Sequence, residues 1–316
     1  MKRLISAALL SITVVVLAGA PAVAQKPVER PKTQTKQDDT KIGVTTVRLP
    51  ITVKEKNKFV TGLTEGNFEV YEDNKRQKID KFISPSQLPL NIAVLMDTSN
   101  SVKLKLPFEK DAAEDFVATV TTYRRSDQVL FATFDSEVEL HQDFTDAQEP
   151  LIRAIRKVKA GGYTRMYDGV YRVIEEKMAN LQGSDARRII VILSDGEDTA
   201  SERKLKEAIE MAQRYDVTIF GISTKNFKGI NSGTNESEDD KELRQLCEQT
   251  GGQVFLPSQK IELFRAFSQV AQDLRQEYVI FYTPENQDKT GKRREIKVKL
   301  VRGAEGRLYH KQGYVY

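Results

Sequence analysis

The chain has 316 residues, of which 39% are hydrophobic, so it is long and apolar enough to bury a sizeable core. Charged residues make up 30% of the sequence but the net charge is only +4, which argues against a nucleic-acid-binding protein. Cys247 is the single cysteine, so the fold cannot rely on an internal disulfide. Its helical spacing from Leu243 and Leu246 predicts a small buried side chain.

The first 24 residues have the layout of a secretory signal peptide. Lys2 and Arg3 precede an apolar stretch, and a triplet of small residues ending at Ala24 follows it. We therefore expect cleavage after Ala24, a secreted or periplasmic protein, and no membrane span after cleavage. An uncleaved anchor is the alternative, because the apolar stretch is close to the shortest length that spans a bilayer.

The segments on either side of the middle of the chain have β-type patterns. Residues 25–42 hold two prolines and many charges, which predicts a disordered linker, and short β-rich runs fill residues 43–88. The pair Asp73-Asn74 between two alternating runs predicts a tight hairpin, since both residues tolerate positive φ. Alternation returns in residues 277–316, as in "REIKVKL". We expect the two segments to pair into a small β-sandwich, with the middle of the chain inserted between them.

Residues 90–276 alternate between apolar strands and helices. The predicted strands are 91–96, 128–134, 188–194 and 217–222, and the predicted helices are about 106–123, 146–158, 166–181, 201–214 and 260–277. Glycine, serine and acidic residues predict a mobile loop at 224–242, followed by a further helix and a short strand in "GGQVFL". Continuous apolar strands separated by helices indicate an α/β domain with a doubly wound, mostly parallel sheet.

Acid and hydroxyl side chains fall in three loops of this predicted domain. Asp97, Ser99 and Ser101 follow the first strand in "MDTSNS", Thr164 stands at the start of a helix, and Asp195 follows "RRIIVILS". Ligands of an open parallel sheet bind beyond the carboxyl ends of its strands. We therefore expect these oxygen atoms at one edge of the sheet.

Oxygen ligands with few charges suit a hard divalent cation that keeps some of its waters. Two carboxylates balance its charge, the hydroxyls add neutral oxygens, and one position stays open for a carboxylate from outside. Each stretch taken alone has a structural alternative: Asp97-Thr98-Ser99 could only cap the following helix, and "SDGEDT" could be only a turn and a cap. All three at one edge favour a site for a divalent metal ion.

Residues 91–275 resemble the von Willebrand factor type A (VWA) domain, a Rossmann-like α/β fold. That family has a metal-ion-dependent adhesion site (MIDAS), whose Asp-x-Ser-x-Ser pattern is matched here by Asp97, Ser99 and Ser101. The threonine of the family's second loop corresponds to Thr164, and the aspartate of its third loop corresponds to Asp195. The flanks, with "GLTEGNFEVYEDNKRQKIDKF" before the site and "GY" near the end, resemble the exported VWFA-related domain proteins seen in Acidobacteria.

The first loop departs from many relatives, which have "SGSM" where this chain has Ser99-Asn100-Ser101-Val102. A less tight loop at Asn100 would alter the affinity for metal. We expect Asn100, Arg165 and Glu197 on the rim of the site, with Arg165 placed to meet an acidic ligand.

The resemblance implies a non-enzymatic binding module in which Mg²⁺ (or Mn²⁺) holds an Asp or Glu side chain of a protein partner. In the family, ligand binding can also move the last helix, here about 260–277. A scaffold or assembly subunit with a degenerate site remains open, as does, on weaker grounds, a metal-dependent hydrolase. Catalysis is disfavoured because the chain has only His141 and His310 and lacks a nucleophile elbow or zinc motif. The sequence leaves the partner and the oligomeric state open.

Overall fold

The computed structural model describes residues 46–56, 58–84, 88–181, 186–225, 238–288 and 290–315. The chain divides into two units, 1–42 and 43–316, and the described residues all belong to the second. The predicted signal peptide (1–24) and linker (25–42) lie outside the described residues. Within the described ranges, no helix combines the length and apolar character needed to cross a bilayer.

A six-stranded sheet lies at the centre of the α/β part, in the order β11-β10-β9-β6-β7-β8. Its strands are β6 (Leu90–Asp97), β7 (Gln128–Phe134), β8 (Val138–Thr145), β9 (Arg187–Ser194), β10 (Val217–Ser223) and β11 (Val254–Phe255). Every neighbouring pair is parallel except β7 and β8. The predicted mostly parallel sheet is therefore confirmed. Strand β8 was not predicted, because its half-exposed "VELHQDFT" lacks the apolar run that marks the other strands.

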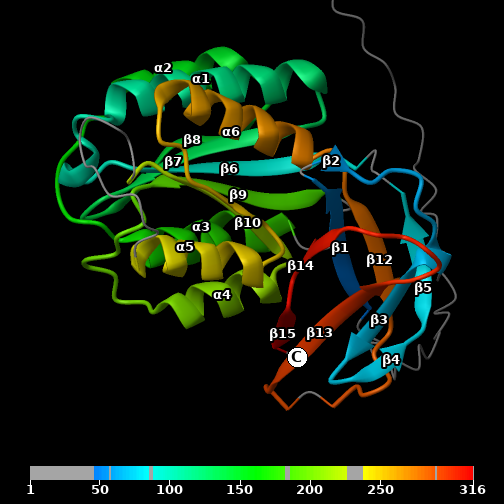
Figure 1. Ribbon diagram of the computed structural model, residues 1–316. Helices are drawn as coiled ribbons and strands as arrows, with labels where there is room; N and C mark the ends of the chain where they lie inside the picture. The colour runs from blue at the N-terminus through cyan, green and yellow to red at the C-terminus, as the bar shows by residue number, and fades with distance from the viewer. Residues whose placement is uncertain are drawn as a thin grey trace, which may run out of the picture. The chain divides into compact units, whose positions relative to one another are not determined.

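Helices cover both faces of this sheet (Figure 1). They are α1 (Leu106–Tyr123), α2 (Gln148–Lys157), α3 (Met166–Val173), α4 (Leu205–Arg214), α5 (Glu238–Gln249) and α6 (Lys260–Asp273). Successive strand residues point to opposite faces, so Ile92 and Val94 pack into one apolar cluster with α1, α2 and α6. Ala93 and Leu95 pack into the other cluster, with α3, α4 and α5. Cys247 is buried in this second cluster, as predicted.

The limits of two predicted helices and of one predicted loop were wrong, and α6 also ends earlier than predicted. The predicted helix 166–181 is α3 followed by a π-helical turn, Ile174–Met178, and a 3-10 turn, Ala179–Leu181. Helix α4 begins at Leu205 rather than 201, because the Glu207 carboxylate accepts a 2.9 Å hydrogen bond from the Lys204 amide and fixes the start there. Helix α5 begins at Glu238, inside the predicted loop 224–242; residues 226–237 of that loop lie outside the described residues.

Helix α6 ends at Asp273, although the apolar pattern predicted a helix to 277. The amides of Arg275 and Gln276 bond to the carbonyls three residues earlier, which tightens the last turn and ends the helix. The chain then passes directly into β12 (Tyr278–Tyr282).

The β-rich segments form two antiparallel sheets. A five-stranded sheet has the order β14-β1-β12-β5 with β2 beside β1, and a four-stranded sheet has the order β15-β13-β3-β4. The remaining strands are β1 (Val47–Glu55), β2 (Lys58–Phe59), β3 (Phe68–Glu72), β4 (Lys75–Gln77), β5 (Ile79–Ile83), β13 (Arg293–Leu300), β14 (Arg307–His310) and β15 (Gly313–Val315). A short 3-10 helix, Glu65–Asn67, precedes β3.

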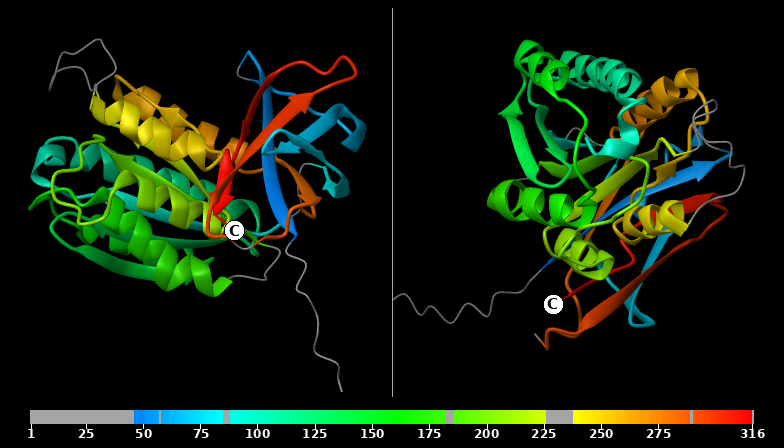
Figure 2. Two further views of the ribbon diagram at one scale, coloured as in Figure 1. Left: turned by 90° about the horizontal axis from the view of Figure 1, so that it is seen from below. Right: turned by 90° about the vertical axis from the view of Figure 1, so that its left-hand side faces the viewer.

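Strands from distant parts of the sequence pair in both sheets: β1 lies against β12, and β3 against β13 (Figure 2). A third apolar cluster, which includes Leu49, Val70 and Ile280, draws on both sheets. The predicted hairpin is confirmed, since Asp73 and Asn74 adopt φ of 48° and 66° between β3 and β4.

Two ion pairs connect these sheets with the α/β part. Lys54 of β1 pairs with Asp273 at the end of α6, and both side chains are buried. The Lys54 ammonium also lies 3.0 Å from the side-chain oxygen of Gln253. Lys311 pairs with Asp216, the residue before β10. The α/β part and the β-sheets are therefore joined by one fully buried ion pair and by a second pair in which Asp216 stays partly exposed.

Candidate metal site at the switch point of the sheet

The strand order places the predicted site at the topological switch point of the sheet. From β6 the chain adds β7 and β8 on one side and β9, β10 and β11 on the other, so the direction of winding changes between β6 and β9. Asp97 is the last residue of β6, and Asp195 comes directly after β9. Open α/β sheets bind ligands in the crevice at this point, outside the carboxyl ends of the strands.

The Asp97 carboxylate is completely buried and held at both oxygens. Oδ1 accepts a 2.8 Å hydrogen bond from the Ser99 amide, as in an Asx-turn, and Oδ2 accepts a 2.7 Å bond from the Ser194 hydroxyl. Burial and the nearby charge of Asp195 raise the pKa of Asp97 to about 7, despite these hydrogen bonds. A cation beside Asp97 would counter both effects.

The first loop brings two hydroxyls together. A 3-10 turn, Asn100–Val102, follows β6, and the hydroxyl oxygens of Ser99 and Ser101 lie 2.8 Å apart. Ser99 is buried, whereas Ser101 is exposed. Neither Asp97 nor Ser99 caps α1, whose N-cap is Lys105, and Ser99 makes no side-chain cap to the 3-10 turn. The capping alternative for this stretch is therefore wrong.

Thr164 in the second loop is 3% exposed and is fixed through its main chain by the third loop. Its amide donates a 3.0 Å hydrogen bond to the Thr199 hydroxyl, and its carbonyl accepts bonds of 3.0 Å from the amides of Thr199 and Ala200. The Asn100 amide donates to the Gly162 carbonyl at 3.2 Å, so the first loop is tied to the second as well.

Asp195 has one carboxylate oxygen that fits a cation. Oδ1 is buried and makes no hydrogen bond within the described part of the chain, and Oδ2 lies 3.7 Å from the buried ammonium of Lys105. Buried polar atoms rarely lack a partner, so Oδ1 requires an explanation such as a bound ion. The described residues hold no group of three or more His, Cys, Asp or Glu suited to a metal. This site would instead combine two carboxylates with three hydroxyls, a hard-oxygen set of the kind that Mg²⁺ accepts.

The predicted rim residues differ in their surroundings. Asn100 and Glu197 are exposed. Arg165 is half-buried, with Nη1 3.7 Å from Asp168 and 3.9 Å from Glu202, so acids of this chain already surround it. A contact between Arg165 and a ligand stays a prediction.

Several residues near the site were not found from the sequence. Leu104, in the turn between Ser101 and α1, is 69% exposed, and so is Tyr163, the bulky residue that the sequence already shows beside Thr164. Ser194, Lys105 and Glu109 are buried. A signal for the last two exists: they lie four residues apart, on the same face of α1 as the buried Ala112 and Ala113.

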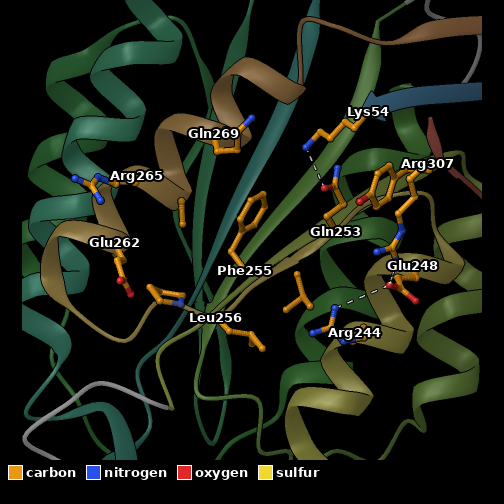
Figure 3. Close-up of a pocket in the computed structure, with 14 residues that line it drawn as sticks. Lys54, Arg244, Glu248, Gln253, Phe255, Leu256, Glu262, Arg265, Gln269 and Arg307 are labelled. Atoms are coloured by element: carbon orange, nitrogen blue, oxygen red, sulfur yellow. Dashed lines mark hydrogen bonds and ion pairs between the residues drawn. The ribbon is translucent and has the colours of Figure 1, made fainter. Parts of the chain in front are cut away.

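A cavity of about 480 Å³ lies elsewhere, between α5, α6, β11 and the strands β1 and β14 (Figure 3). Figure 3 shows Lys54 and Arg307 on one side of Phe255 and Arg265 and Glu262 on the other. Arg307 lies 3.2 Å from Glu248, and Lys54 is paired with Asp273. None of the residues of the three loops lines this cavity.

Fold and loops together define an α/β domain with an acid- and hydroxyl-lined site at its switch point. The family model of the von Willebrand factor type A domain matches residues 91–271, more than half of the chain, and the protein belongs to this family.

Integrin alpha-M from Mus musculus is 25% identical over 194 residues, which are 59% of this chain and 16% of the integrin. The chain thus spans about 16% of the length of that relative. Among solved structures, proximal thread matrix protein 1 from the mussel byssus, in a form with a zinc-occupied MIDAS motif, is 20% identical with a TM-score of 0.46, over 60% of this chain and 49% of that one. An aerotolerance-related membrane protein from Bacteroides fragilis is 13% identical with a TM-score of 0.45, over 58% and 98%.

Proposed function

We propose that this protein is an exported, non-enzymatic VWA-domain protein that binds a protein partner through a divalent cation, Mg²⁺ (or Mn²⁺). The residues that would hold the cation are Asp97, Ser99, Ser101, Thr164 and Asp195. The cation would supply the positive charge that attracts an Asp or Glu side chain of the partner, and the surrounding loops would select which partner binds.

One observation carries the proposal: two carboxylates meet at the switch point, and one buried oxygen, Asp195 Oδ1, has no hydrogen-bond donor among the described residues. Burial and, after it, the charge of Asp195 raise the pKa of Asp97, so the two carboxylates lie within electrostatic reach of each other. Two adjacent buried acids destabilise a fold unless positive charge is supplied. A divalent cation removes this cost, and three hydroxyls from the first and second loops complete a hard-oxygen environment.

The exposure of the loop residues indicates the side from which a partner would approach. Four of the five candidate ligands are buried, and Ser101 is exposed. Around it lie exposed residues of the first and second loops, Asn100, Leu104 and Tyr163. We therefore propose that the partner carboxylate enters from the Ser101 side and that apolar groups beside that carboxylate contact Leu104 and Tyr163.

Export rests on the pattern of residues 1–24. Processing would remove the apolar stretch and leave a mature chain that begins at Gln25. N-terminal sequencing of the protein recovered from the native cell envelope and culture medium tests this, and recovery of chains that still begin at Met1 would contradict it.

The binding function is tested by capture from the native cell envelope in Mg²⁺ and in EDTA. The wild-type protein should retain a partner in Mg²⁺ only, and Asp97→Ala should retain none in either buffer. Isothermal titration with Mg²⁺ alone measures the cation independently of the partner. A metal-dependent turnover of esters or phosphates that Asp97→Ala abolishes would contradict the non-enzymatic assignment.

A further inference from the structure

Helix α1 begins with two charged side chains that are buried. Lys105 is 3% exposed and Glu109 is 1% exposed, and the Glu109 amide donates a 3.1 Å hydrogen bond to the Lys105 carbonyl. Lys and Glu are almost never fully buried unless other charges or hydrogen bonds compensate them. Their burial therefore indicates that charged or hydrogen-bonding groups near the three loops of the metal site compensate them.

Both side chains belong to the surroundings of the metal site. The Lys105 ammonium lies 3.7 Å from Asp195 Oδ2. Glu109 Oε1 accepts a 2.7 Å hydrogen bond from the Thr224 hydroxyl, and the Thr224 amide donates a 2.8 Å bond to the carbonyl of Ser194. Since Ser194 holds Asp97, the end of β10 and the start of α1 join the same network as the two acidic ligands.

Glu109 Oε2 is buried and has no hydrogen-bond partner among the described residues. Asp195 Oδ1 is likewise a buried carboxylate oxygen without a hydrogen-bond partner among the described residues. Burial is the main cause that raises the pKa of Glu109, and the Thr224 hydrogen bond opposes it. Smaller effects come from the charges of Asp97 and Asp195, which raise this pKa, and of Lys105, which lowers it, so these groups lie within electrostatic reach of one another. When ionised, three carboxylates and one ammonium sum to a charge of minus two, which a divalent cation balances.

We propose that Lys105 and Glu109 set the affinity of the site for its divalent cation in opposite directions. This inference rests on the proposed function. The Lys105 ammonium pairs with one carboxylate oxygen of Asp195, and its positive charge repels a cation that binds at the site. Glu109 is a positioning residue that offsets Lys105 and adds negative charge behind the ligands. Mutating the side chains that contact metal ligands from behind typically changes metal affinity by about 10- to 100-fold.

The proposal also predicts the behaviour of the chain without metal. Lys105 then carries the only positive charge that this network has among the described residues, next to Asp195. Replacing it with an apolar residue leaves the acids unbalanced, so the metal-free protein loses stability while the stabilisation by added Mg²⁺ grows. A merely structural role for Lys105 would not increase the gain from Mg²⁺.

The test measures Mg²⁺ binding by isothermal titration and thermal unfolding in EDTA and in Mg²⁺, on the full chain. Lys105→Met should bind Mg²⁺ about 10-fold more tightly than wild type, and Glu109→Gln about 10-fold more weakly. Lys105→Arg and Glu109→Asp, which keep the charges, should stay close to wild type. Matched controls are Lys103→Met in the same turn and Asp115→Asn on α1, both exposed side chains, which should change affinity by less than about twofold.

Circular dichroism establishes that each variant is folded, and if Lys105→Met does not fold, the same expectation applies to Lys105→Gln. Suppose that wild type binds Mg²⁺ and that Lys105→Met and Glu109→Gln both bind it with affinities within about twofold of wild type. This result would overturn the inference and leave the proposed function standing. Weaker binding by Lys105→Met would also overturn it, since Lys105 would then position Asp195 for the metal. A wild-type protein that binds no Mg²⁺ would overturn both.

Discussion

The Ser194 hydroxyl donates a 2.7 Å hydrogen bond to Asp97 Oδ2, and both residues are completely buried. The bond joins the last residues of β6 and β9, the two strands between which the direction of winding changes. Ser194 Oγ also accepts a 3.1 Å hydrogen bond from the Gly196 amide. One hydroxyl therefore fixes the first acidic ligand and the turn that carries the second.

Ser194→Ala should lower the stability of the metal-free protein by about 1–3 kcal/mol, because it removes the hydrogen bond from a buried carboxylate. Urea denaturation in EDTA measures this loss. Ser268→Ala is the matched control, since Ser268 is exposed and bonds only to a carbonyl of its own helix. A Ser194→Ala protein as stable as Ser268→Ala would show that this hydroxyl does not hold Asp97 in solution.

Asp97→Asn should abolish stabilisation by Mg²⁺, because the amide removes one of the two charges that balance the cation. A wild-type protein in Mg²⁺ at 100 times its dissociation constant should gain about 2.7 kcal/mol in free energy of unfolding. The variant should gain nothing, and the exposed-site variant Asp146→Asn should gain as much as wild type. Equal gains for Asp97→Asn and wild type would place the cation elsewhere.

Tyr163→Ala and Leu104→Ala should weaken partner capture without weakening Mg²⁺ binding, since both side chains are 69% exposed on the ligand loops. Truncation of a central contact residue costs about 1–2 kcal/mol, or roughly 5- to 30-fold in affinity. Tyr123→Ala is the control, because Tyr123 is 70% exposed but lies at the other end of α1. Quantified capture in Mg²⁺ compares the three variants, and equal losses for Tyr163 and Tyr123 would refute a contact surface at the metal loops.

Much of this fold follows from local sequence patterns. Strand β7 and helix α1 have the predicted limits, because an unbroken apolar run and a helical period mark them. The positions of Asp97 and Asp195 at strand ends follow from the same patterns. The order β9-β6-β7 depends on which strands pair across the sheet, which no local pattern encodes. The sequence thus placed both acids at one edge but could not place them on adjacent strands.

The roles of Lys105 and Glu109 could not be predicted for a related reason. A charged residue in a helix is usually solvent-exposed, and a sequence pattern does not say where a helix end lies relative to a sheet. Lys105 and Glu109 are buried because Asp195 and Thr224, from the ends of β9 and β10, supply their partners. These contacts join residues about 90 to 115 positions apart in the chain.

The pKa of Glu109 leads to a prediction for the pH dependence of stability. Burial raises this pKa from 4.5 to about 8 in the chain without cation, so the folded state keeps a proton that the unfolded state has lost. Stability from this group is present below about pH 4.5 and is lost as the pH rises toward about 8, by at most about 1.4 kcal/mol per pH unit.

Urea denaturation in EDTA at pH 5 and pH 8 measures this loss. Wild type should be less stable at pH 8, and Glu109→Gln should show a smaller difference between the two pH values. The comparison between the two proteins isolates Glu109 from Asp97, whose pKa is raised as well. Identical pH profiles for the two proteins would exclude a raised pKa at Glu109.

The buried pair of Lys54 and Asp273 should stabilise the connection between β1 and α6. Gln269 and Gln253 also donate hydrogen bonds to Asp273, at 2.6 Å and 3.2 Å. Burial raises the pKa of this carboxyl, and Lys54 and the two glutamines oppose that shift. Lys54→Met leaves this carboxylate buried without its ammonium and should cost about 3–5 kcal/mol in urea denaturation. Lys58→Met, at an exposed site on the neighbouring β2, should cost little.

Adding Asp273→Leu to Lys54→Met should recover most of the lost stability, because a buried ion pair exchanged for apolar residues is often neutral. Recovery would show that the cost of Lys54→Met comes from the unpaired charge, whereas loss of packing would make the double variant the less stable one. Neither variant changes the three loops of the metal site. Under conditions in which each variant is fully folded, its affinity for Mg²⁺ should therefore match that of wild type. A weaker affinity in the folded Lys54→Met protein would show instead that the end of α6 is coupled to the metal site.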